Sequence, residues 1–184
     1  MKALRSLIAA VTFLTCAPLA AQSHAEEDSD AGVAASASLR SANWSAPTPL
    51  TIPGARRLMT EELRAMLWRG EPPLLFDVLG GETHDSLPGA IWLPGAGRGR
   101  SFTDEVQRQL ARVLEQTAQG SRSRALVFFC ASKACWLSYN AALRAVQLGY
   151  TQVYWYRGGI DAWLAAGEKT TPLTTAWKRP PEDG

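Results

Sequence analysis

Apolar positions in the middle of the chain fall into short runs that are separated by stretches with helical spacing. The runs cover residues 74–78, 90–93, 125–129 and 152–156, and the third, Ala-Leu-Val-Phe-Phe, has no polar position. A continuous apolar run of this length, bounded by turn residues, is typical of a strand that is buried on both faces. These runs predict four strands of a buried sheet.

The intervals around these strands carry apolar stripes at helical spacing. Thr60 is the expected N-cap of the first helix, and Ser101 with Asp104 resembles a capping box before the second. Strands that alternate with helices favour a parallel sheet with helices on both faces. The four predicted helices lie within residues 60–70, 101–120, 136–149 and 159–166.

The first 25 residues are organised like an export signal. Two basic residues precede an apolar stretch at residues 6–16, which is too short to span a bilayer comfortably, and small residues follow. We expect a Sec signal peptide over residues 1–25, cleaved after Ala25 or Ala21, and a periplasmic protein in a bacterium. The alternative is a lipoprotein that is acylated at Cys16.

The remaining chain reads as one domain with a segment at each end. Residues 26–53 are rich in Ala, Ser, Asp, Thr and Pro, which predicts a flexible leader, with Trp44 docking on the domain surface. Residues 170–184 predict a C-terminal tail. The single predicted domain covers residues 54–169, an ordinary domain length.

Composition excludes several classes of protein. The 184 residues are 46% apolar and 20% charged, with a net charge of +2, which is too small to indicate a nucleic-acid surface. Removal of the signal peptide leaves 17 basic and 17 acidic residues and no further long apolar run, so the mature chain is not expected to span a membrane. Two cysteines and one histidine then remain, too few for a zinc-finger array.

Those two cysteines flank the loop after the buried run at residues 125–129. Ligands bind beyond the carboxyl ends of parallel strands, and Cys130 leaves such a strand while Cys135 begins the next helix. Backbone N–H groups of a curled loop and the helix dipole favour a thiolate, so Cys130 is the predicted reactive sulfur. Cys135 is its predicted catalytic partner. The predicted substrate-binding loop comprises Ala131, Ser132, Lys133, Ala134 and Trp136, with Lys133 adding positive charge.

Other polar positions favour structural roles. Asp77, at a strand end, is expected to tie down a loop by hydrogen bonds. His84 lies in a turn and is expected to be a solvated surface histidine. The Gly-Arg-rich stretch at residues 95–100 imitates a phosphate loop but lacks its Lys-Ser/Thr, so its arginines are expected to be solvated.

Several short motifs are spaced along the predicted domain. They are Asp77-Val78, Leu87-Pro88-Gly89-Ala90, Cys130, Ala141-Ala142, Gly149-Tyr150, and Gly158-Gly159 with Trp163. In this order they resemble the rhodanese-like domain over about residues 55–167. The resemblance implies a parallel sheet of about five strands, and a sulfane sulfur carried as a persulfide on Cys130. The loop departs from the usual Cys-x-x-Gly-x-Arg, because it has neither that glycine nor that arginine.

The string Cys-Trp-Leu-Ser-Tyr-Asn-Ala-Ala, which starts at Cys135, is similar to a narrower family, the PQQ-dependent catabolism-associated CXXCW motif proteins. That resemblance implies an exported protein associated with alcohol oxidation by quinoprotein dehydrogenases. Four residues separate Cys130 and Cys135, where the family name implies two.

Three functions follow as hypotheses. The first is a sulfurtransferase-like carrier that loads Cys130 from a small sulfur donor, passes the sulfur to a small acceptor or thiol, and uses Cys135 as a resolving thiol. The second is a thiol–disulfide redox protein that uses both cysteines. The third is a non-catalytic accessory module of a quinoprotein dehydrogenase system, with Cu(I) binding by the two thiolates as a variant. A purely structural disulfide is the further alternative. No cofactor or dedicated metal site is expected.

Overall fold

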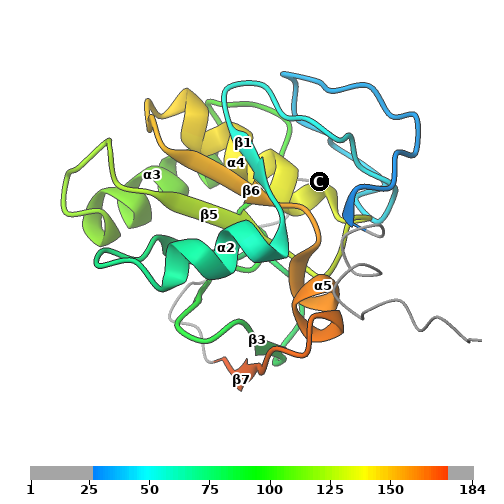
Figure 1. Ribbon diagram of the computed structural model, residues 1–184. Coiled ribbons are helices and arrows are strands. Elements are labelled where there is room, and N and C mark those ends of the chain that lie inside the picture. The colour runs from blue at the N-terminus through cyan, green and yellow to red at the C-terminus, as the bar shows by residue number, and fades with distance from the viewer. Residues whose placement is uncertain (1–26, 174–184) are drawn as a thin grey trace, which may run out of the picture.

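Five parallel strands form the central sheet in the order β1-β6-β5-β2-β4 (Figure 1). The computed structural model describes residues 27–173, so the predicted signal peptide, Cys16 and residues 174–184 lie outside the described residues. The predicted third strand, within the fully apolar run at residues 125–129, is β5, which lies at the centre of the sheet. The strands are β1 (Arg56–Leu58), β2 (Leu74–Asp77), β4 (Ile91–Trp92), β5 (Leu126–Phe129) and β6 (Val153–Tyr156).

Helices cover both faces of the sheet, as predicted. Side chains of a strand alternate between its two faces. In β5, Leu126 and Phe128 therefore join the core beneath α3 and α4, whereas Val127 and Phe129 join the core beneath α2 and α5. This arrangement confirms the α/β fold. The helices are α2 (Thr60–Leu67), α3 (Glu105–Thr117), α4 (Trp136–Gln147) and α5 (Gly159–Ala165).

The structure differs from the predicted elements at short or polar positions. The edge strand β1 was not predicted, because it is three residues long and begins with two arginines. The N-cap of α2 is Met59 rather than Thr60, and Asp104, not Ser101, caps α3 by accepting the Gln107 N–H. Local propensity located these helices correctly but placed the first N-cap one position too late and the second three positions too early.

A small antiparallel pair lies outside the main sheet. It joins β3 (Asp85–Ser86) to β7 (Thr171–Pro172), so part of the predicted C-terminal tail forms regular structure. Neither strand was predicted, since two residues carry no detectable periodicity.

The predicted leader has little regular structure, but residues 27–53 lie against the domain instead of extending from it (Figure 1). The Ser36 N–H donates to the Tyr139 hydroxyl over 2.9 Å, and the Arg40 N–H donates to the Asn140 side chain over 3.0 Å. Trp44 packs against the core, as expected. Polar composition predicted flexibility, whereas side chains of α4 provide partners for the leader backbone.

Candidate functional site

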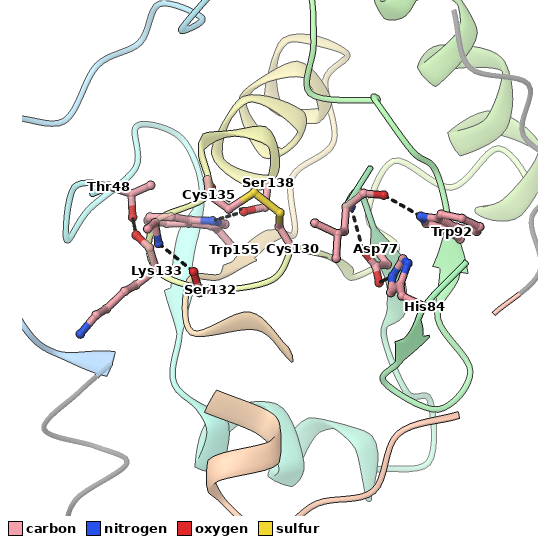
Figure 2. The surroundings of a disulfide bond; sticks show 12 residues. Thr48, Asp77, His84, Trp92, Cys130, Ser132, Lys133, Cys135, Ser138 and Trp155 are labelled. Carbon is pink, nitrogen blue, oxygen red and sulfur yellow. Dashed lines mark hydrogen bonds and ion pairs between the residues drawn. A yellow bond between two sulfur atoms is a disulfide. The ribbon is translucent and has the colours of Figure 1, made fainter. Parts of the chain in front are cut away.

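Cys130 and Cys135 form a disulfide at the carboxyl edge of the sheet (Figure 2). Cys130 directly follows β5 and is 1% exposed, whereas Cys135 is the partly exposed N-cap residue of α4. Their Cα atoms lie 6.3 Å apart, within the range that a disulfide spans. The structure therefore brings together the two cysteines that the sequence singled out.

The start of the disulfide loop is seated on the amino end of α5. The Ile160 N–H donates to the Cys130 carbonyl over 3.0 Å, and the Asp161 N–H donates to the Ala131 carbonyl over 2.9 Å. Gly159 has a φ of +62°, and a Cβ there would overlap the Cys130 carbonyl oxygen. The Gly158-Gly159 pair at the start of α5 thus permits a close backbone approach that fixes the first half of the loop.

The end of the loop is seated on the leader. The Trp136 N–H donates to the Trp44 carbonyl over 2.8 Å, and an isolated antiparallel bridge joins Ser45 to Cys135. Thr48 donates both its N–H and its hydroxyl to the Lys133 carbonyl, over 3.2 and 2.7 Å. Residues 44–48, which we call the strap, therefore hold Lys133 and Cys135 of the cysteine loop and Trp136, the first residue of α4.

These contacts occupy backbone N–H groups of the loop that were expected to stabilise a thiolate at Cys130. The N–H groups of Ala134, Cys135 and Trp136 already donate to oxygen atoms of Ser132 and Trp44. The side chain of Lys133 points away from the disulfide (Figure 2), and its Nζ donates to Ser29 Oγ over 2.9 Å. The expected contribution of Lys133 to the charge around Cys130 is thus not what the structure shows.

A buried arginine lies behind the strap. Arg157 directly follows β6 and is 2% exposed. Its guanidinium donates to the Thr48 hydroxyl and carbonyl over 3.1 and 3.0 Å, and to the carbonyls of Glu27 and Ser29. Burial lowers the pKa of Arg157, and the nearby Arg57 charge acts in the same direction, while Asp30 and Asp28 oppose it.

A second polar chain fixes the carbonyl of Cys135. Ser138 Oγ donates to that carbonyl over 3.2 Å, and Trp155 Nε1 of β6 donates to Ser138 Oγ over 3.0 Å (Figure 2). Trp136, a member of the predicted substrate-binding loop, packs in the core and donates its Nε1 to the Pro47 carbonyl over 3.0 Å.

The neighbouring loop after β2 is built around Asp77. This fully buried carboxylate accepts hydrogen bonds from the Leu79 N–H, from His84 Nε2 and from Ser86 Oγ. Asp77 thus has its predicted structural role. His84 is not the solvated residue that was expected: it lies 2.7 Å from Asp77 and packs edge-on against Trp92.

The Gly-Arg-rich stretch also has a structural role. Gly97 lies so close to Leu137 in α4 that a Cβ would overlap the Leu137 backbone, and its carbonyl accepts the Asn140 side-chain N–H over 2.8 Å. Arg98 is not simply solvated, because its guanidinium lies over the Trp44 ring, 5.0 Å from the centroid.

Sequence reasoning missed Thr48, Arg157 and Ser138. Arg157 stands just before the Gly-Gly pair, and its position after a strand that shares the site's edge was the available signal. Thr48 lies in an aperiodic Pro-Thr-rich stretch that offered none. Within residues 27–173, no group of three or more His, Cys, Asp or Glu side chains could hold a metal ion, and no helix is long and apolar enough to cross a membrane.

With this geometry established, comparison with known proteins identifies the family. The model of the rhodanese-like domain matches residues 59–166, more than half of the chain, and the chain therefore belongs to the rhodanese-like domain family. Comparison with curated proteins gives no match.

Solved structures with a similar fold include two sulfur-transferring proteins. Thiosulfate sulfurtransferase from Pseudomonas aeruginosa is 21% identical, with a TM-score of 0.45; the alignment covers 68% of this chain and 21% of that one. The polysulfide-sulfur transferase homodimer from Wolinella succinogenes is 15% identical, with a TM-score of 0.45 and coverage of 64% and 79%. This chain thus spans about a fifth of the Pseudomonas enzyme.

Proposed function

We propose that this rhodanese-like protein carries sulfane sulfur as a persulfide on Cys130 and that Cys135 resolves the persulfide by closing the disulfide. The observation that carries the proposal is the Cys130–Cys135 disulfide at the carboxyl end of β5. In a parallel α/β sheet this edge is where ligands bind.

The cycle begins with the dithiol form. The Cys130 thiolate attacks the terminal sulfur of a sulfane donor R–S–SH, forming Cys130–S–SH and releasing RS⁻. The sulfur then passes to an acceptor thiol, or the Cys135 thiolate attacks Cys130 Sγ. The second route forms the Cys130–Cys135 disulfide and releases HS⁻, so each bond that breaks is replaced by one S–S bond.

The disulfide form must be reduced before it can accept sulfur again. Cys130 is buried and Cys135 is partly exposed, so an external thiolate reaches Cys135 Sγ first and Cys130 leaves as thiolate. A second external thiolate then attacks the mixed disulfide, releasing Cys135 as thiolate and carrying away an external disulfide. Thiols of this kind are the proposed partners of the site.

The difference in exposure also favours a second candidate function. A partly exposed cysteine at a helix N-cap, bonded to a buried one, suits a thiol–disulfide redox protein that exchanges electrons without carrying sulfur. Both functions use the same disulfide, but only the sulfur carrier releases sulfide when it closes.

Sulfide release therefore tests the proposal. The protein without its predicted signal peptide is reduced, freed of reductant, exposed to inorganic polysulfide, freed of the donor and assayed for sulfide over time. Wild type should release about one sulfide per chain as its two free thiols disappear, whereas Cys135→Ser, which has no resolving thiol, should keep its sulfur. Disulfide formation without sulfide release would favour the redox protein instead.

We also propose that the protein is exported to the periplasm and serves a PQQ-dependent quinoprotein dehydrogenase system. The signal-like residues 1–25 and the resemblance at Cys135 support this, and a disulfide suits an oxidising compartment. Fractionation of a Gram-negative host that produces the full chain should place a shortened protein in the periplasm. Slower alcohol-dependent growth after deletion from a host that carries such a system would support the association, and unchanged growth would contradict it.

A further inference from the structure

The strap connects the cysteine loop to a buried arginine that directly follows β6. The Lys133 carbonyl, between the two cysteines, accepts both the N–H and the hydroxyl of Thr48. The same hydroxyl accepts the Arg157 Nε–H over 3.1 Å, and the Thr48 carbonyl accepts a second guanidinium N–H over 3.0 Å. A continuous chain of hydrogen bonds therefore runs from Arg157 through Thr48 to the loop.

The two side chains that form this chain of hydrogen bonds, Thr48 and Arg157, are shielded from water. Thr48 is 1% exposed and Arg157 is 2% exposed. Hydrogen bonds to a buried charged group are stronger than neutral ones, and a buried donor left without its acceptor costs further free energy. The guanidinium also binds the carbonyls of Glu27 and Ser29, so its planar donors fix the leader at several points.

We propose that Thr48 and Arg157 are positioning residues that hold the Cys130–Cys135 loop in the geometry that closes the disulfide, and that they thereby set the dithiol–disulfide equilibrium of the site. This rests on the proposed cycling of the two cysteines. The hydrogen bonds occur with the disulfide closed, and opening it separates the two sulfur atoms that fix the ends of the loop. By linkage, contacts that favour the closed loop raise the equilibrium constant for closing it.

The test is equilibration of the protein with glutathione. Protein dithiol and glutathione disulfide react to give protein disulfide and two molecules of reduced glutathione. The fractions of protein dithiol and protein disulfide, trapped at equilibrium, yield the equilibrium constant. Thr48→Val keeps the shape of the side chain and the backbone bond to Lys133 but removes the hydroxyl. It should lower the constant about threefold to tenfold, the range expected for one lost hydrogen bond.

Three further variants separate positioning from general damage. Thr48→Ser restores the hydroxyl and should return the constant to the wild-type value. Thr151→Val removes an exposed hydroxyl that donates to the Arg122 carbonyl elsewhere, and should leave the constant unchanged. Arg157→Lys keeps the positive charge but loses the planar guanidinium with its several N–H donors. It should shift the equilibrium constant in the same direction as Thr48→Val. Equal constants for Thr48→Val and Thr48→Ser would overturn the proposal.

Hydrogen exchange in the wild-type protein gives an independent measurement that needs no variant. The Trp136 N–H, bound to the Trp44 carbonyl, and the Thr48 N–H, bound to Lys133, should exchange at least threefold faster in the dithiol form than in the disulfide form. Equal exchange at both amides in the two forms would overturn the coupling. Sulfur loading of Cys135→Ser is measured separately, so failure of the positioning proposal remains distinct from failure of sulfur carriage.

Discussion

Two neighbouring parallel strands, β2 and β5, end at the same edge of the sheet, yet the loops that follow them are held in opposite ways. After β2, one buried carboxylate, Asp77, accepts three hydrogen bonds from residues no more than nine positions away. After β5, a disulfide closes the loop, and Thr48 binds it from 85 positions away. The first loop is organised locally, whereas the second depends on chain segments that are remote in sequence.

This difference indicates which loop can respond to chemistry. The loop after β2 is held by the hydrogen bonds of Asp77, and these do not depend on a redox reaction. The Cys130 loop contains a bond that thiols can open, and its second half is held by a leader that lies over the domain. A site that cycles between dithiol and disulfide requires the second kind of loop.

Removal of the Asp77 carboxylate should cause the largest loss of stability. Asp77→Ala leaves the buried Ser86 hydroxyl and the His84 ring without their acceptor. We expect the free energy of unfolding to fall by about 3 kcal/mol in urea titrations. The exposed neighbour Asp85 provides the control, since Asp85→Ala should change stability by less than about 0.5 kcal/mol. A loss below about 1 kcal/mol for Asp77→Ala would show that the carboxylate does not organise this loop.

Reduction of the disulfide should have a smaller effect. The bond closes a loop with a sequence separation of five, for which the chain-entropy estimate gives about 2 kcal/mol. Urea titrations of wild type with and without reductant measure this difference. The double variant Cys130→Ser, Cys135→Ser should not respond to reductant, and a response as large as that of wild type would refute the assignment of the effect to this bond.

The smallest of these effects concerns the contact between the leader and α4. Tyr139→Phe removes the hydroxyl that bonds to the N–H and carbonyl of Ser36, and should cost about 1 kcal/mol at neutral pH. Burial raises the Tyr139 pKa above its ordinary value of 10.0, although the Ser36 hydrogen bond opposes this.

The sign of the pH dependence follows from that shift. The folded chain keeps the Tyr139 proton where the unfolded chain loses it, so its contribution to stability is complete below about pH 10 and is lost as pH rises through the raised pKa. The unfolding free energy of wild type should therefore fall more steeply above pH 10 than that of Tyr139→Phe. Identical slopes would contradict the shift at this residue.

The sequence predicted the parts of this site that depend on local patterns. A fully apolar run predicted the buried strand β5, and the cysteines at its end and at the start of the next helix identified the edge where the site lies. The structural role of Asp77 was predicted because a polar residue at the end of a buried strand needs nearby hydrogen-bond donors.

The remaining parts depend on tertiary contacts that no local pattern encodes. Residues 26–53 have the composition of a flexible segment, and only the assembled face of α4 provides partners such as Tyr139 and Asn140 for their backbone. His84 looked like a surface residue because the turn around it is polar, whereas the folded chain turns it toward Asp77. The contacts of the leader and the orientation of His84 thus depend on where these residues lie in the fold, and not on residue type alone.

The most direct test of sulfur carriage is the intact mass of two single-cysteine variants after exposure to a sulfane donor. Cys135→Ser keeps the proposed carrier and should gain one sulfur atom that a reductant removes. Cys130→Ser keeps only the helix-cap cysteine and should gain none under the same conditions. Equal gain by both variants, or gain by Cys130→Ser alone, would contradict the account that Cys130 carries the sulfur and Cys135 resolves it.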